Sequence, residues 1–216
     1  MKQGIFAVHK PLGITSQRAV QIVKRNFRGE RVGHAGTLDP LAEGVLVIAV
    51  GRAFTKQLGD VVEAEKEYIT TVQFGATSDT DDDEGVKTAC NVAHIPSHDD
   101  VLAILPQFVG EITQAPPAFS AAKISGQEAY KRARRGEKFS LGEHHVTVKE
   151  IELTEYTWPT ATLRVVTGPG VYVRALGRDI GAALNVGGYL TKLVRTRVGQ
   201  FTLEATQPLS NFETEK

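Results

Sequence analysis

Apolar positions along the chain either run together or alternate with polar ones, and both patterns predict strands. Six consecutive apolar residues, Val45–Val50, predict a strand that is buried on both faces. Alternation and many β-branched or aromatic residues predict four further strands, at residues 4–9, 67–74, 144–156 and 160–167. Two of these, 144–156 and 160–167, are close in the chain and should pair antiparallel.

Other segments have apolar residues at helical spacing or a basic, helix-favouring composition. They predict helices at residues 16–27, 51–60, 97–108, 127–135 and 173–184. Ser16 and Ser97 stand where the first and third of these begin, and each can serve as a cap. The last helix has apolar residues three, four and four apart, which predict one buried face: Val173, Leu176, Ile180 and Leu184. Arg174 and Arg178 share another face of that helix.

Composition fits one globular domain, because 216 residues with 41% hydrophobic and 23% charged positions can bury a good core. The longest apolar runs are far too short to cross a membrane, and the N-terminus has no signal-peptide pattern. Cys90 is the only cysteine, so no intrachain disulfide is possible and the reducing cytoplasm is the expected location.

Net charge is zero, with 25 basic and 25 acidic residues, but the charges are segregated along the chain. Basic residues dominate Ser120–Lys138 and Arg174–Arg197, where they form either solvated faces or contacts to nucleic acid. Asp79–Glu84 carries five carboxylates without the glycine and distal glutamate of a calcium-binding EF-hand loop. We therefore interpret this acidic segment as a solvated turn, and we expect no metal site.

A loop rich in glycine and proline, from Gly33 to Pro40, leads directly into the buried strand. Asp39 lies at the end of this loop, so its carboxylate is mounted on a rigid element, as catalytic side chains often are. Asp before Pro is also a common way to start a turn, and the local residues alone do not separate the two interpretations.

The ordered residues of this loop, G-H-x-G-T-L-D-P-x-A-x-G-V-L, resemble the signature of the TruB-like family of tRNA pseudouridine synthases. Further stretches resemble the family in the right order and cover nearly the whole chain. They are K-P-x-G-x-T-S from Lys10, K-x-Y from Lys66, QAPPAFSAAKISGQEAYKRARRG from Gln114, VYVRALGRDIG from Val171 and LVRTRVGQF from Leu193. Val171 replaces the threonine that is usual in the family, and Pro169 precedes Gly170, so the loop before Tyr172 departs from the pattern.

The resemblance implies an α+β fold with a mixed, mainly antiparallel sheet, flanked by helices. It further implies a single catalytic domain over residues 1–216, with a thumb-like insertion at about 114–142 and a short tail at 203–216. Many relatives carry a small C-terminal RNA-binding domain, for which we expect no room here. The protein is expected to be a monomer without a cofactor.

By resemblance, the activity is isomerisation of the uridine at position 55, in the T loop of tRNA, through base flipping and an aspartate-dependent exchange of the glycosidic bond. Asp39 corresponds to the catalytic residue, and Arg174 would pair with it. Tyr68 would stack on the flipped base and His34 would fill the gap that the base leaves. Tyr172 and Leu193 would complete the pocket. Contacts to the RNA backbone are expected from Lys123, Arg132, Arg134, Arg135 and Arg195.

Two alternatives remain. One is a non-catalytic RNA-binding or RNA-folding module on the same scaffold, since a fold does not fix a function. That alternative predicts loss of the aspartate or the tyrosine, whereas Asp39, Tyr68 and Arg174 are all present. The other alternative is the same isomerisation on another RNA or within a guide-RNA complex.

Overall fold

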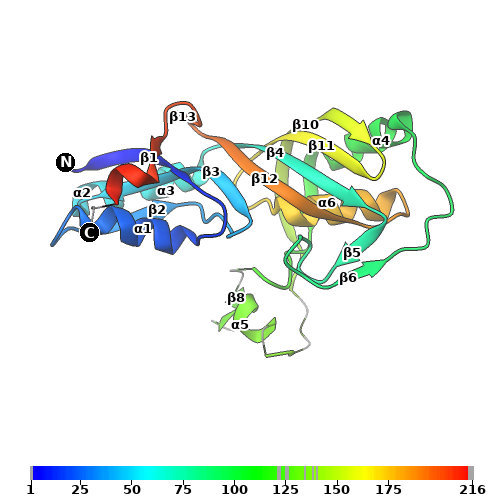
Figure 1. Ribbon diagram of the computed structural model, residues 1–216, viewed down its shortest axis with the longest axis horizontal. Coiled ribbons are helices and arrows are strands. Elements are labelled where there is room, and N and C mark those ends of the chain that lie inside the picture. The colour runs from blue at the N-terminus through cyan, green and yellow to red at the C-terminus, as the bar shows by residue number, and fades with distance from the viewer. Residues whose placement is uncertain are drawn as a thin grey trace. The chain divides into compact units, whose positions relative to one another are not determined.

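The computed structural model describes residues 2–120, 123–124, 127–133, 135–137, 139 and 141–213. The chain forms two compact units (Figure 1). Met1–Ile69 and Lys192–Lys216 make the first unit, and the intervening Thr70–Thr191 makes the second. The chain passes from one unit to the other within strand β4 (Lys66–Phe74) and returns within strand β12 (Gly188–Val198).

The sheet of the first unit is built around β3 (Ala42–Val50), the strand predicted from its apolar run. Strand β1 (Gly4–Lys10) pairs with it antiparallel along its whole length. On the other side, β2 (Val32–Ala35) pairs antiparallel with the second half of β3, and β12 pairs parallel with its first residues. The last seven residues of β3, from Gly44 to Val50, are all buried. The fully buried strand is therefore confirmed.

Helix α1 (Ser16–Arg25) covers this sheet with the predicted apolar face, since Ala19, Val20, Val23 and Phe27 are buried. Its cap differs from the prediction: Thr15 accepts the Arg18 N–H at 3.0 Å, while the Ser16 hydroxyl bonds elsewhere. Two short helices, α2 (Arg52–Thr55) and α3 (Leu58–Glu63), replace the single helix expected at 51–60. Near the C-terminus, β13 (Phe201–Thr202), β14 (Gln207–Pro208) and the 3-10 helix η2 (Leu209–Phe212) complete the unit.

The sheet of the second unit has the strand order β4, β11, β10, β7. Strands β10 (His144–Thr157) and β11 (Thr160–Thr167) pair antiparallel, as predicted. The edge strand β7 (Gly110–Gln114) pairs antiparallel with the beginning of β10. A separate hairpin consists of β5 (Ala76–Ser78) and β6 (Lys87–Ala89).

Helix α6 (Val173–Ala183) supplies the main helical packing of the second unit, and it buries Val173, Leu176 and Ile180 as predicted. The fourth residue of the predicted face, Leu184, follows the helix as its C-cap and is only half-buried. Helix α4 (His98–Ile104) begins with a capping box in which Ser97 and Asp100 bond each other's main chain. It continues as the 3-10 helix η1 (Leu105–Phe108). The helix predicted from Ser97 is therefore confirmed, although its last turn tightens where Pro106 lacks an N–H.

The insertion leaves the sheet at the end of β7 and returns at the start of β10. Gln114 and His144 are partners across these two strands, so both ends of the insertion are fixed side by side. Its described part contains the short strands β8 (Lys123–Ile124) and β9 (Gln127–Glu128) and helix α5 (Ala129–Ala133). The predicted basic helix is thus shorter than 127–135, because its first residues form a hairpin.

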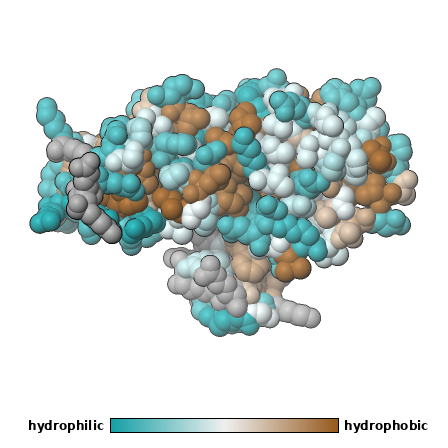
Figure 2. Space-filling view, in the orientation of Figure 1, coloured by the Kyte–Doolittle hydropathy of each residue, from teal (hydrophilic) through white to brown (hydrophobic). Residues whose placement is uncertain are grey.

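The α+β class with a mainly antiparallel, mixed sheet is confirmed in both units. On the face shown in Figure 2, hydrophobic residues interrupt a surface that is mostly hydrophilic or intermediate. Within the described ranges, no helix combines the length and hydropathy that crossing a bilayer requires. Whether the chain functions as one domain remains a prediction.

Candidate active site

The loop that carries Asp39 connects β2 to β3 and is held at alternate residues. Ser16 Oγ donates to the Leu38 carbonyl at 2.9 Å and accepts the Leu38 N–H at 2.8 Å. Pro40 O accepts the Gly13 N–H at 2.8 Å, and Asp39 O accepts the Ala42 N–H at 3.1 Å. Bonds on both sides of Asp39 fix its main chain, so the carboxylate is presented from a rigid mount.

Arg195 on β12 holds the same loop from the opposite end. Its Nε donates to Val45 O at 2.7 Å and its Nη2 donates to Gly36 O at 2.9 Å. Gly36 has a φ of +70°, and a Cβ there would lie 3.2 Å from Arg195 Nη1, so glycine gives the guanidinium room. Arg195 is only 1% exposed. This burial contradicts the expectation that Arg195 contacts RNA phosphates and gives it a structural role instead.

Lys10 is a buried cation near Asp39. Its Nζ donates to Pro11 O and Ile14 O, both at 2.8 Å, and its side chain is fully buried. Burial lowers the pKa of Lys10 to about 8, while the negative charge of Asp39 acts in the opposite direction. Lys10 therefore stabilises the turn that holds Pro40 and contributes positive potential beside the candidate catalytic carboxylate.

The other candidate residues of the first unit lie on strands around this loop. His34 is on β2, where burial and then the Arg195 charge lower its pKa, so it is neutral at pH 7. Leu193 on β12 pairs with Ala42, three residues after Asp39. Tyr68 on β4 is 8% exposed and follows Glu67, whose carbonyl accepts a bond from the Thr196 hydroxyl on β12. Each of these three candidates therefore lies on, or adjacent to, the strands that support the loop.

Arg174 begins helix α6 in the second unit and is 5% exposed. Its Nη1 forms an ion pair with Asp82 Oδ2 at 3.1 Å and also donates to Thr80 O at 2.9 Å. Its Nη2 donates to Phe119 O at 2.9 Å. Sequence reasoning missed Asp82 as a partner of Arg174, and the pairing of Arg174 with Asp39 stays a prediction.

Asp81 and Arg178 form a second ion pair beside the first, with 2.7 Å between Oδ2 and Nη1. Asp81 and Asp82 are 8% and 2% exposed, so interpreting the whole segment as a solvated turn was wrong. Burial raises the pKa of Asp81, although Arg178 acts in the opposite direction. The main chain of this turn pairs with Leu190. The pairing holds the turn so that the carboxylates of Asp81 and Asp82 face the arginines of α6.

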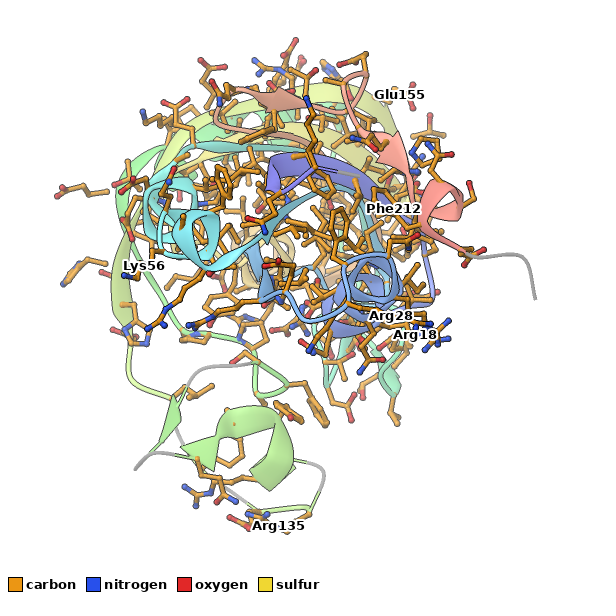
Figure 3. The ribbon with its side chains drawn as sticks, turned by 90° about the vertical axis from the view of Figure 1, so that its left-hand side faces the viewer. Arg18, Arg28, Lys56, Arg135, Glu155 and Phe212 are labelled. Carbon is orange, nitrogen blue, oxygen red and sulfur yellow. The ribbon has the colours of Figure 1, made fainter. Side chains whose placement is uncertain are left out.

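The cations of the insertion are partly occupied by a carboxylate of the same segment. Arg132 Nε lies 2.7 Å from Glu137 Oε2, and Arg135 Nε lies 2.6 Å from Glu137 Oε1. Arg135 belongs to the part of the insertion at the bottom of Figure 3. Arg134 and the side chain of Lys123 lie outside the described part of the chain. Phosphate contacts by Arg132 and Arg135 would have to compete with Glu137.

Cations are also exposed on helix α1 and in the turn that follows it. Arg18 and Arg28, both exposed, point outward from the first unit in Figure 3. No group of three His, Cys, Asp or Glu side chains among the described residues is arranged to hold a metal ion. The described chemistry is therefore that of carboxylates, arginines and aromatic rings.

The chain is similar to a family model and to several known proteins. Residues 24–173 match the TruB family pseudouridylate synthase (N terminal domain). The chain is 41% identical to tRNA pseudouridine synthase B of Corynebacterium glutamicum, over 98% of this chain and 72% of that protein. It is 43% identical to tRNA pseudouridine synthase B of Bacteroides fragilis, over 94% of this chain and 90% of that protein.

A solved structure supports the same relationship. The crystal structure of a Cbf5-Nop10-Gar1 complex contains a chain that is 30% identical and superposes with a TM-score of 0.74. The match covers 96% of the present chain and 52% of that chain. The likeness therefore extends over both compact units.

Proposed function

Since the chain belongs to the TruB family of pseudouridylate synthases, we propose that it isomerises a uridine of tRNA, position 55 in the T loop, to pseudouridine. The observation that carries this proposal is the fixed loop of Asp39 between β2 and β3. It presents a carboxylate within the family's G-T-L-D-P sequence. The relatives' names supply tRNA as the substrate class.

The reaction breaks the bond between uracil N1 and the ribose and joins ring C5 to the same sugar carbon. The C5 proton leaves and N1 gains a proton, so no electrons are added or removed and the balance requires no redox cofactor. A carboxylate can assist as a nucleophile or as the counter-charge of a sugar cation. Asp39 fits either role, because the loop that carries it is held by Ser16 at Leu38 and by Arg195 at Gly36 before substrate arrives.

The remaining candidate residues serve binding. A stacked base must leave its helix at a cost of about a few kcal/mol, and an aromatic side chain in the site recovers part of it. Tyr68 supplies that ring, and His34, neutral at pH 7, replaces the departed base without adding charge. The resemblance assigns the rest of the pocket to Leu193 and Tyr172, and it assigns the pairing with Asp39 to Arg174.

The RNA partner is the T-arm stem-loop of tRNA, bound by a monomer in the cytoplasm. Charge segregation supports this choice, because α1 and the insertion expose cations although the net charge is zero. Phosphate contacts of this kind make affinity salt-dependent. A guide-RNA complex is the competing assignment, and an isolated stem-loop that is modified without any guide would exclude it.

The decisive test is Asp39→Asn, which keeps the shape and removes the charge. We expect turnover on a T-arm stem-loop to be lost while RNA affinity stays within about tenfold, roughly 1.4 kcal/mol. Glu43→Gln is the matched control, since Glu43 is a half-buried carboxylate on β3, four residues after Asp39 in the chain. The control should retain turnover. An Asp39→Asn variant that forms pseudouridine at nearly the wild-type rate would remove Asp39 from the reaction.

A further inference from the structure

Gln114 is a buried amide at the point where the insertion leaves the sheet. It is the last residue of β7 and only 2% exposed. Its Oε1 accepts the Tyr172 N–H at 2.8 Å, whereas its Nε2 is buried and has no hydrogen-bond partner among the described residues. A buried donor without a partner carries a free-energy cost, because it has lost its hydrogen bonds to water. An apolar side chain would avoid that cost but could not accept from Tyr172.

Tyr172 is the residue that starts α6. Its φ and ψ of −96° and 103° are extended, and its own side chain makes no capping bond to the helix. The departure from the family pattern at Pro169 and Val171 lies directly before it. The side-chain oxygen of Gln114, Oε1, therefore fixes the main chain where that altered loop meets the helix that carries Arg174.

Two more bonds join α6 to the residues after Gln114. Arg178 Nη2 donates to Ala115 O at 3.0 Å, and Arg174 Nη2 donates to Phe119 O at 2.9 Å. Residues 114–119, which we call the root of the insertion, contain Pro116 and Pro117, both buried. Because proline fixes φ and has no N–H, this part of the root is stiff. Three hydrogen bonds thus connect a stiff root to the first two turns of α6.

We propose that Gln114 is a positioning residue of the pseudouridine synthase reaction, which acts by setting Tyr172 and the start of α6 relative to the root of the insertion. The proposal rests on the proposed function and extends it to a residue that touches neither the base nor the sugar. Its physical basis is that the protein retains a costly unpaired amide in order to keep one acceptor in place.

The test separates the acceptor from the unpaired donor. Gln114→Met removes both, whereas Gln114→Glu keeps an oxygen that accepts from Tyr172 in either protonation state and replaces the unpaired NH2 group by oxygen. We expect Gln114→Met to lower the single-turnover rate at saturating T-arm stem-loop about tenfold or more, because small misplacements of binding groups are costly. Gln114→Glu should stay within about threefold of wild type, and RNA Kd should change little in both variants.

A direct readout accompanies the kinetics. Hydrogen exchange of the Tyr172 amide, followed by NMR, should accelerate in Gln114→Met and remain slow in Gln114→Glu. Glu111→Gln is the control, since Glu111 is exposed on the same strand and should alter neither rate nor exchange. If Gln114→Met does not fold, Gln114→Asn replaces it, because a side chain shorter by one methylene withdraws the acceptor while remaining polar.

Two results would overturn the proposal. One is a wild-type single-turnover rate in Gln114→Met, or its Asn replacement, when the Tyr172 amide has lost protection. The other is an equal loss of rate in Gln114→Glu and Gln114→Met, since the acceptor would then not be the cause. If the wild-type protein itself forms no pseudouridine in this assay, the proposed function has failed and the role of Gln114 is decided by the exchange data alone.

Discussion

Replacing Arg195 by methionine distinguishes a structural arginine from an RNA-binding one. The change keeps much of the side chain's length and removes the charge and both hydrogen bonds, to Val45 O and Gly36 O. Hydrogen bonds from a charged donor contribute about 1.5–3 kcal/mol each. The loss should lie near the lower end of their sum, at about 3 kcal/mol, because the buried guanidinium's desolvation cost disappears with it.

Unfolding in urea and on heating measures this loss. For a chain of this size, 3 kcal/mol corresponds to a decrease in Tm of roughly 6–12 °C. Arg195→Lys keeps the charge but offers a single nitrogen for two separate carbonyls, so it should lose about half as much. Arg197→Met is the matched control on the same strand, because its side chain is partly exposed and its 3.5 Å ion pair with Glu65 contributes at most about 1 kcal/mol.

Two further measurements connect the loss of stability in Arg195→Met to the candidate active site. The pKa of His34, followed by NMR, should rise in Arg195→Met because a nearby positive charge is gone. The single-turnover rate at saturating RNA should fall on the order of tenfold, since Gly36 lies three residues before Asp39. The reasoning is refuted if unfolding is unchanged while the slope of log affinity against log salt drops by about 0.7–0.9, the signature of a lost phosphate contact.

Three other predictions concern charged groups. The folded pKa of Lys10, about 8, lies below the unfolded value of 10.5, so the unfolded chain binds more protons between these values and the free energy of unfolding rises with pH there. Lys10→Met should abolish this rise, as measured by urea unfolding at pH values between 8 and 10.5. Asp82→Asn removes the Asp82 carboxylate from its ion pair with buried Arg174 and should cost about 3 kcal/mol in thermal unfolding, and a loss below about 1 kcal/mol would contradict this. Glu137→Gln releases Arg132 and Arg135 from their shared carboxylate, so binding assays across salt concentrations should show higher RNA affinity and a slope steeper by about 0.7–0.9 per new phosphate contact, whereas an unchanged slope would argue against it.

The regular elements were predictable because their signals are local. The apolar run of β3 and the buried faces of α1 and α6 follow from periodicity within one element, and all three are confirmed. The same local reasoning did not identify which hydroxyl caps α1. Thr15 and Ser16 are chemically alike, and only the position of Leu38, 22 residues after Ser16, assigns one to the helix and the other to the loop.

The buried charges were mispredicted for a related reason. In a run of five carboxylates nothing local marks Asp81 and Asp82 as inward, since their partners on α6 are more than 90 residues away. The i, i+4 spacing of Arg174 and Arg178 was the available signal that two acids must face that helix. For Arg195, strand alternation offered a signal that basic charge obscured, because period two places it on the same face of β12 as buried Leu193.

The two parts of the proposed machinery differ in how much remains to be ordered when RNA binds. Around Asp39, the main chain at residues 36, 38 and 40 is already bonded to Arg195, Ser16 and Gly13. Such a loop gains little further order from substrate, so its contribution to the reaction is preorganised. In the insertion, by contrast, Arg132 and Arg135 must exchange Glu137 for phosphate, which makes RNA contact there a competition between anions. Mutations in the loop should therefore appear mainly in the rate at saturating RNA, and mutations in the insertion mainly in affinity and its salt dependence.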